Sequence, residues 1–84
     1  MRYDYTPSGV CSVKISFDLS DGIVSNIVFT RGCSGNTQGV SRLAEGMRAE
    51  ELISRLEGIQ CGTKGTSCPD QLAKALKQAK AAQA

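Results

Sequence analysis

Four cysteines are the residues of this 84-residue chain whose chemistry could define a function: Cys11, Cys33, Cys61 and Cys68. The chain has no histidine and no tryptophan, so thiols are its main candidates for metal ligands or redox groups. Clustered thiolates bind Zn²⁺ or iron–sulfur clusters, whereas a lone buried cysteine behaves as a small hydrophobic side chain. What the chain does therefore depends on whether its fold brings the four thiols together.

The spacing of the cysteines leaves three interpretations open. Between successive cysteines lie 21, 27 and 6 residues, and the C-x2-C pairs typical of zinc knuckles are absent. The four could share a metal or cluster site, two of them could exchange a disulfide with a partner, or all could be inert or disulfide-bonded. Cys11 lies on the apolar face of a predicted strand, which suits the inert interpretation. Cys61 and Cys68 are flanked by Gly, Thr, Lys and Ser, which favours a site.

The first third of the sequence predicts an antiparallel hairpin. Residues 11–19 alternate between apolar and polar, as in a strand with one buried face. The Asp-Gly pair at residues 21–22 tolerates the positive φ angles of a tight hairpin turn. A second strand is predicted over residues 23–31, whose apolar side chains do not alternate cleanly and so suggest partial cover on both sides. Tyr3 and Tyr5 also alternate, and we expect them to add a short edge strand.

Three helices are predicted after this hairpin. The first lies between Asn36 as N-cap and Gly46 as terminator. Its apolar positions are Val40, Leu43, Ala44 and Met47. The second ends at Gly58, and its apolar positions are Ala49, Leu52, Ile53 and Leu56. The third begins at Ser67-Cys68-Pro69-Asp70, where a serine cap, a proline and an acidic first turn agree. We therefore expect one α+β domain over residues 1–84: a small antiparallel sheet of two or three strands, followed by three helices packed on one face.

These elements predict that the cysteines meet at one end of the sheet. With Asp21 near the centre of the turn, Cys11 pairs opposite Arg31, and Cys33 lies about two positions beyond. Cys33 and Cys68 each lie near the start of a helix, where the positive end of the helix dipole favours a thiolate. The glycine-rich loop before Cys68 can bend back on itself, so the remaining cysteine can reach the other three. We therefore expect all four within one coordination sphere.

Composition and charge argue against other classes of function. The formal net charge is +2, and the four aromatic residues form no cluster suited to stacking bases, so we expect no nucleic-acid partner. No apolar run is long enough to cross a membrane, and the first residues do not resemble a signal peptide. We therefore expect a cytoplasmic protein, in which clustered cysteines are more often metal ligands or redox thiols than permanent cross-links.

A signature near the third helix carries a family resemblance. The chain resembles the TSCPD domain in Gly65-Thr66-Ser67-Cys68-Pro69-Asp70, and upstream in Gly9-Val10-Cys11-Ser12, Gly32-Cys33, Gly46-Met47 and Cys61-Gly62. That family is known from the C-terminal end of adenosylcobalamin-dependent ribonucleoside-diphosphate reductases and as small free-standing proteins. The resemblance implies a role accessory to deoxyribonucleotide synthesis, with a reductase or a thiol-redox protein as partner. Reductase catalysis itself needs a barrel, a radical cofactor site and a substrate pocket, for which 84 residues have no room.

A second, more distant resemblance concerns iron–sulfur scaffolds of the IscU and NifU type. It implies that three positions match the cluster-binding cysteines of those scaffolds: Cys11, Cys33 and Cys68. Val13 stands where the scaffolds have an aspartate, Ser67 stands where they have a histidine, and Cys61 is additional. A fourth thiolate suggests closed coordination by four sulfurs, which favours holding Zn²⁺ or a cluster over handing it on. Cluster assembly, and thiol–disulfide exchange by the last two cysteines, remain the alternatives.

The loop before the third helix has a second interpretation. Residues 62–67 carry two glycines ahead of a helix N-terminus, where backbone amides can bind the phosphate of a nucleotide. Lys64 precedes the second glycine, however, whereas the lysine of a Walker loop follows it. We expect the loop to bend Cys61 toward Cys68, with nucleotide binding as the lesser alternative.

Overall fold

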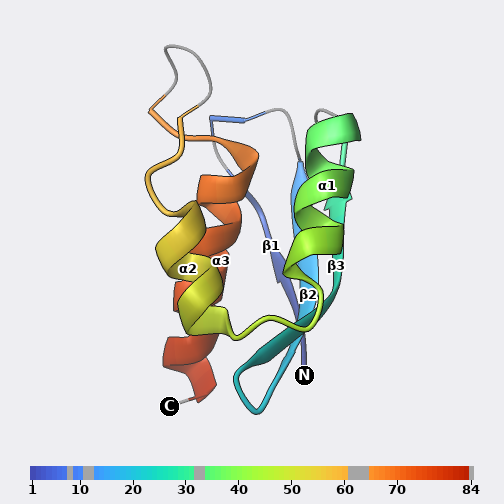
Figure 1. Cartoon of the computed structure of the whole chain (residues 1–84). Coiled ribbons are helices and arrows are strands. Elements are labelled where there is room, and N and C mark those ends of the chain that lie inside the picture. The colour runs from blue at the N-terminus through green and yellow to red at the C-terminus, as the bar shows by residue number, and fades with distance from the viewer. Residues whose placement is uncertain (8, 11–12, 32–33, 61–64, 84) are drawn as a thin grey trace.

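A computed structural model describes residues 1–7, 9–10, 13–31, 34–60 and 65–83. Its six elements are β1 (Arg2–Tyr5), β2 (Lys14–Ser20), β3 (Ile23–Thr30), α1 (Ser34–Ala44), α2 (Ala49–Leu56) and α3 (Cys68–Gln83). The strands form one antiparallel sheet in the order β1-β2-β3, and the three helices follow it in the chain (Figure 1). The predicted α+β fold, with a small antiparallel sheet followed by three helices, is confirmed.

A two-residue turn joins β2 to β3, as the sequence predicts. Ser20 pairs with Ile23, so only Asp21 and Gly22 lie between the strands. Their φ angles are 52° and 78°, in the left-handed region that an Asp-Gly pair can adopt. A turn of this kind matches the natural twist of the two strands, so the hairpin closes without splaying them.

A β-bulge in the middle of the hairpin changes the predicted register. Near the turn Leu19 pairs with Val24, but beyond the bulge Lys14 pairs with Thr30. The extra residue on β3 is accommodated at Asn26, whose φ is 51°. The two-residue turn shifts the predicted pairing by one position, and the bulge shifts it by one more.

The predicted alignment of the cysteine end of the hairpin is therefore wrong. Pairing Cys11 with Arg31 would set Lys14 opposite Val28, whereas Lys14 lies opposite Thr30. Cys11 itself lies outside the described residues, as does the cysteine expected beside it. Their proximity stays a prediction.

The bulge also explains why the apolar residues of β3 do not alternate. Val24 is fully buried, and after the extra residue Ile27 again faces the core, with 7% exposure. Ile23 and Val28 are 36% and 49% exposed. The buried side chains of β3 thus belong to one face of the sheet, and the expectation of partial cover on both sides is wrong.

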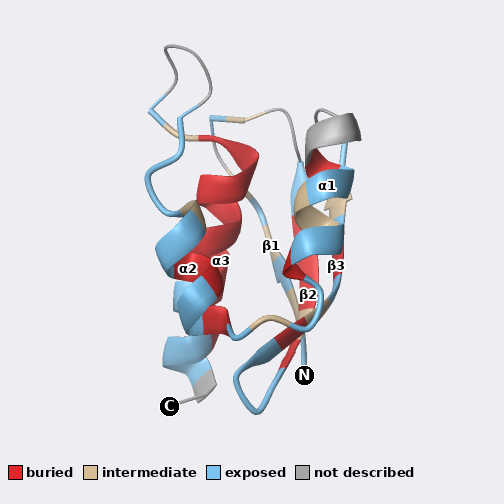
Figure 2. Ribbon diagram, in the orientation of Figure 1, coloured by how far each residue is buried: buried red, intermediate tan, exposed pale blue. Residues whose placement is uncertain are grey.

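One face of the sheet and the three helices enclose the hydrophobic core. Ile15, Phe17 and Leu19 alternate along β2 and are almost completely buried, as predicted. Tyr3 of β1 stacks on Phe17, with ring centroids 5.7 Å apart. The helices complete the core with Ala44, Ala49, Leu52, Ile53, Leu72, Ala73, Ala75, Leu76 and Ala79. Figure 2 shows the first turns of α3 as the most thoroughly buried part of the helical layer.

Helix α1 differs from the predicted pattern in its start and in its buried face. It begins at Ser34, so Asn36 lies inside the helix and is not its N-cap. Thr37 and Ala44 are 7% and 1% exposed, whereas Leu43 is 81% exposed. Residues three, four and seven apart share one helix face. A buried stripe that begins at Thr37 therefore turns Leu43 toward solvent.

The connection between α1 and α2 lies against the outer edge of β3. The amide of Val24 donates to the Met47 carbonyl at 2.9 Å, and the amide of Gly46 donates to the Val24 carbonyl at 2.8 Å. The amide of Asn26 donates to Oε1 of Glu45 at 2.9 Å. These bonds satisfy backbone groups that an edge strand otherwise exposes, and they fix where α2 begins.

The element ends that flank the cysteines all lie at one end of the molecule. β2, α1 and α3 begin there, and β3 and α2 end there (Figure 1, upper end). The hairpin turn and the last turn of α3 lie at the opposite end. The five elements thus have the ends nearest the cysteines directed toward the same end of the molecule.

Candidate functional site

Cys68 is the predicted ligand that falls among the described residues. It is the first residue of α3 and is buried, with 8% exposure. Cys11, Cys33 and Cys61 lie outside the described residues, so whether the four thiols meet stays a prediction. Residues within a few positions of each of them are described, and two sets of contacts link these nearby residues.

The first set joins the segments near Cys11 and Cys33 to each other and to the residues before α3. The amide of Val13 donates to the Thr30 carbonyl at 2.9 Å, so β2 and β3 remain bonded at this end. Gly9 lies against the residues before α3: a Cβ placed on it would sit 3.3 Å from Cγ2 of Thr66. Its φ of 74° and this close approach both suit glycine. The segment before Cys11 therefore touches the segment before Cys68.

The second set joins the end of α2 to the start of α3. Oγ of Ser67 donates to the Ile59 carbonyl at 2.7 Å. The amide of Gly58 donates to Oδ1 of Asp70 at 2.8 Å, and Oγ1 of Thr66 donates to Oδ2 of the same carboxylate. Both described ends of the loop that contains Cys61 are therefore held by side chains of the TSCPD pentapeptide.

The start of α3 is capped as the sequence predicts. The amide of Asp70 donates to Oγ of Ser67 at 3.1 Å, and the amide of Gln71 donates to the Ser67 carbonyl at 2.8 Å. These are the bonds of a serine N-cap with an acidic residue three positions later. The cap fixes Cys68 at the first position of the helix, with its backbone orientation set.

Asp70 is the buried ionised group of this region. It is 3% exposed. The hydroxyl of Thr66 lowers the pKa of this carboxyl by donating a hydrogen bond to it, and this effect outweighs burial, which raises the pKa. The Gly58 amide and the Lys74 ammonium, the latter at 3.5 Å, lower the pKa further. Since its oxygens are bonded, the carboxylate can stay charged in a buried position.

The same network extends to β1. Nε2 of Gln71 donates to Oγ1 of Thr66 at 2.9 Å, and the hydroxyl of Tyr5 donates to Oε1 of Gln71 at 3.3 Å. Gln71 is 2% exposed. The start of α3 is thus bonded to the edge strand as well as to the end of α2.

The sequence identified Asp70 only as an acidic residue in the first helical turn. Its hydrogen bond to Gly58 spans 12 positions of the chain, and no local sequence pattern predicts such a contact. The only sequence signal is the pentapeptide itself, in which three polar side chains surround a cysteine and a proline.

No group of three or more His, Cys, Asp or Glu side chains that could hold a metal occurs among the described residues. Half of the loop proposed to bind a phosphate, residues 62–64, also lies outside the described residues, so nucleotide binding stays a prediction.

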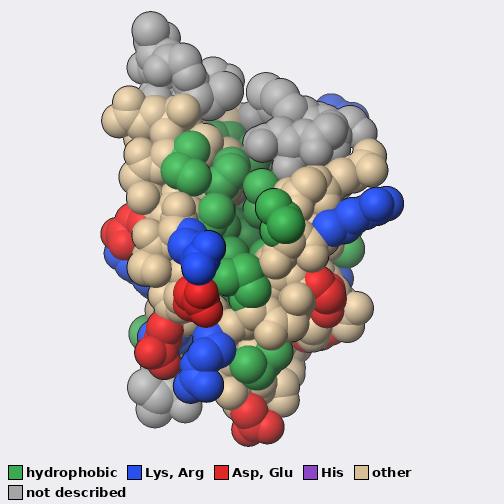
Figure 3. All heavy atoms as spheres, viewed as in Figure 1, with side chains coloured by type: hydrophobic (Ala, Val, Ile, Leu, Met, Phe, Trp, Pro, Cys, Tyr) green, Lys and Arg blue, Asp and Glu red, His purple; other side chains and the backbone are tan. Residues whose placement is uncertain are grey.

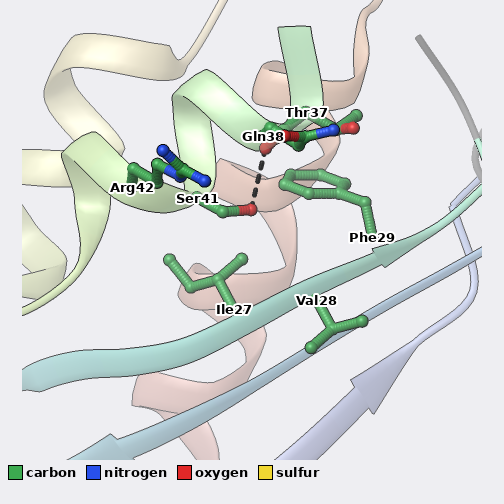
Figure 4. A pocket seen from close by; sticks show the side chains of 7 residues that line it. All are labelled: Ile27, Val28, Phe29, Thr37, Gln38, Ser41 and Arg42. Carbon is green, nitrogen blue, oxygen red and sulfur yellow. Dashed lines mark hydrogen bonds between the residues drawn. The ribbon is translucent and has the colours of Figure 1, made fainter. Parts of the chain in front are cut away.

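A shallow hollow of about 250 Å³ lies between α1 and β3. Its lining residues are Ile27, Val28, Phe29, Thr37, Gln38, Ser41 and Arg42 (Figure 4). Oγ of Ser41 donates to the Thr37 carbonyl at 2.8 Å, so this hydroxyl is engaged within α1. The lining contains neither a carboxylate nor a thiol, and it offers no metal ligand set or general base.

The surface seen in Figure 3 carries no large patch of one charge. Basic and acidic side chains are interspersed, and hydrophobic side chains form a strip between α1 and the pair α2 and α3. No helix in the described part of the chain combines the length and the apolar character needed to cross a membrane.

Comparison with known proteins gives the family. No curated protein and no solved structure gives a significant match to the chain, so the likeness to iron–sulfur scaffolds stays a prediction. The family model of the TSCPD domain matches residues 1–80, almost the whole chain. The chain therefore belongs to the TSCPD domain family.

Proposed function

We propose that this chain is a small metal-binding module in which four thiolates hold one Zn²⁺ ion or one iron–sulfur cluster. The ligands are Cys11, Cys33, Cys61 and Cys68. One observation carries the proposal: the described segments next to these cysteines contact one another at a single end of the fold. Gly9 touches Thr66, and Val13 bonds to Thr30.

The reach of the chain supports a shared site. Each of the other three cysteines lies within three residues of a described contact: Cys11 of Val13, Cys33 of Thr30 and Cys61 of Ile59. Two residues of extended chain span at most about 7 Å, and three span at most about 11 Å. Four sulfurs bound to one Zn²⁺ lie about 3.8 Å apart. Tethers of this length support a site that the three thiols share with Cys68.

A bound metal would add folding free energy to a domain whose hydrophobic core is small. A chain of this length buries only about 60 to 65% of its unfolded surface, which leaves the core marginal. A structural metal in a tetrathiolate site adds folding free energy, because the assembled site does not exist in the unfolded chain. Closed coordination by four sulfurs leaves no open position for a substrate, so the module holds its metal and performs no catalysis at it.

The biological setting proposed is deoxyribonucleotide synthesis, with a reductase or a thiol-redox protein as partner. This part rests on the TSCPD family alone. The rival function, thiol–disulfide exchange by Cys61 and Cys68, requires a thiol that a partner can reach. The 8% exposure of Cys68 counts against it.

Metal analysis of protein purified without oxygen tests the proposal. We expect one Zn²⁺, or the iron and sulfide of one cluster, per chain, and four thiols that react only after a chelator removes the metal. Each Cys→Ser variant should lose bound metal. Ala73→Ser is the matched control, because it also places a hydroxyl in the buried part of α3 but removes no thiol.

A colourless, metal-free protein that folds normally would contradict the proposal. Two rapidly reactive thiols in such a protein would support the exchange function in its place. Four reactive thiols that a chelator does not change would point to inert cysteines.

A further inference from the structure

We infer that Asp70 is a positioning residue, whose carboxylate ties the two ends of the loop that precedes α3 and so presets Cys61 and Cys68 for one metal ion. The inference deepens the proposed function and rests on it for its metal-binding consequence. Its geometric part, the closed loop, stands on described residues alone.

The two ends of the loop meet at a single carboxylate. Gly58, which follows α2, donates its amide to Oδ1, and Thr66, which precedes α3, donates its hydroxyl to Oδ2. Between these two residues lie positions 59–65, which include Cys61. The side chain of Asp70 therefore bridges the two ends of the loop.

Ser67 makes a second link between the two ends of the loop, to the residue that follows Gly58. Its Oγ accepts from the amide of Asp70 and donates to the carbonyl of Ile59. Ile59 lies two residues before Cys61. The bonded carbonyl therefore fixes the chain about 7 Å or less from Cys61.

The burial of Asp70 indicates a structural role for its carboxylate. A carboxylate that is 3% exposed has lost its hydration, and the loss is offset only where each oxygen finds donors. Here the donors are a backbone amide and a hydroxyl from the two ends of the loop, together with the ammonium of Lys74 one turn further along α3. A helix start needs only an N-cap, which Ser67 already supplies.

The arrangement assigns a role to each residue of the pentapeptide. Thr66, Ser67 and Asp70 close the loop, Cys68 is the ligand, and Pro69 favours the first turn of the helix. An open loop of this length would lose conformational entropy each time both cysteines bound one metal ion. A closed loop has lost that entropy on folding, so metal binding is stronger.

The charge of Asp70 and its closure of the loop affect metal affinity in opposite directions. A variant that removes the charge therefore distinguishes the two effects. A carboxylate near four thiolates disfavours their ionisation, so removing its charge should by itself strengthen metal binding. Weaker metal binding after Asp70→Asn would therefore report the loss of loop closure. Loss of an outer partner of a ligand weakens metal binding by about 10- to 100-fold.

The test compares Asp70→Asn and Thr66→Val with Asp18→Asn. Asp18 is the matched control, because its carboxylate also accepts hydrogen bonds and also has a lowered pKa, chiefly from the Asn26 side chain. It lies in β2, close to the hairpin turn and far from the loop. Thr66→Val keeps the charge of Asp70 and removes one donor to it, which serves if the asparagine variant folds poorly.

Two quantities are measured for each variant. The first is the Zn²⁺ dissociation constant, by competition with a chromophoric chelator. The second is the equilibrium constant of the Cys61–Cys68 disulfide against glutathione, in a Cys11→Ser, Cys33→Ser background without metal. In that reaction two thiols are oxidised to a disulfide while oxidised glutathione is reduced to two thiols, so the constant gives the effective concentration of one thiol at the other.

We expect Asp70→Asn to weaken Zn²⁺ binding and to lower the effective concentration by about tenfold or more each, with a smaller loss in Thr66→Val. Asp18→Asn should stay within about twofold of the parent protein. Equal effective concentrations in Asp70→Asn and Asp18→Asn would overturn the inference. If the parent protein binds no metal, the proposed function fails, and the glutathione measurement alone decides whether Asp70 closes the loop.

Discussion

The amide of Gly58 donates a hydrogen bond to Oδ1 of Asp70 at 2.8 Å, across 12 positions of the chain. It joins the end of α2 to the first turn of α3, beside the buried Cys68. The TSCPD pentapeptide is thus a structural unit as well as a sequence signature. Its polar side chains close the loop that leads into the helix on which its cysteine lies.

The first prediction concerns stability in acid. The pKa of Asp70 is lowered from its ordinary value of 3.8, chiefly by the Thr66 hydroxyl. A carboxyl whose pKa is lower in the folded state stabilises the fold above its unfolded pKa and loses that contribution as the pH falls through the folded pKa. The difference in unfolding free energy between the parent protein and Asp70→Asn should therefore be largest near pH 6 and shrink below about pH 4. Urea unfolding at pH 3 to 6 measures it.

A constant difference over that pH range would show that the charge of Asp70 contributes nothing. Asp18→Asn is again the comparison, since the pKa of Asp18 is also lowered but this residue belongs to β2. The double variant should show the two effects adding, because the two carboxyls share no partner.

The second prediction concerns the core. Leu76 of α3 is completely buried, whereas Leu43 of α1 is 81% exposed. Leu76→Ala should lower the free energy of unfolding by about 2 to 5 kcal/mol, because it removes buried methyl groups and leaves a cavity. Leu43→Ala should change it by less than about 0.5 kcal/mol. Denaturant unfolding of the two variants checks this, and similar losses would mean that the buried face of α1 is assigned incorrectly.

The third prediction concerns the β-bulge. Asn26 has a φ of 51°, and its Nδ2 donates to Oδ2 of Asp18 at 2.8 Å. A β-branched side chain fits this conformation poorly, so Asn26→Val should destabilise the fold by about 1 to 3 kcal/mol. Asn26→Gly keeps the backbone conformation available and should lose less, about 1 kcal/mol from the missing hydrogen bond. Thermal unfolding separates the two variants, and an equal loss in both would contradict a role for the backbone conformation.

Local signals in the sequence were sufficient for most of the fold. The Asp-Gly turn, the alternation along β2 and the serine cap of α3 depend on residues close together in the chain, and each is confirmed. The bulge was missed because Asn26 adopts a left-handed conformation only in the folded context, where Asp18 and Glu45 bond to it. Leu43 was misassigned because the buried face of α1 is set by contact with β3.

The candidate site was predicted only in part, for the same physical reason. The sequence placed Cys68 at the start of a capped helix, which the structure confirms. It did not indicate that Asp70 and Ser67 close the loop before that helix, because their partners Gly58 and Ile59 are brought to them by the packing of α2 on α3. Polar contacts of this kind depend on tertiary structure and produce no periodic pattern in the sequence.

The most direct test of the proposed metal site is X-ray absorption spectroscopy at the metal edge of protein purified without oxygen. Coordination by Cys11, Cys33, Cys61 and Cys68 predicts a first shell of sulfur at about 2.3 Å with no nitrogen or oxygen ligand, and four sulfurs if the metal is zinc. Cys61→Ser should replace one of these sulfurs by a lighter atom. A first shell dominated by oxygen or nitrogen, or a protein that binds neither zinc nor iron, would contradict the four-cysteine site.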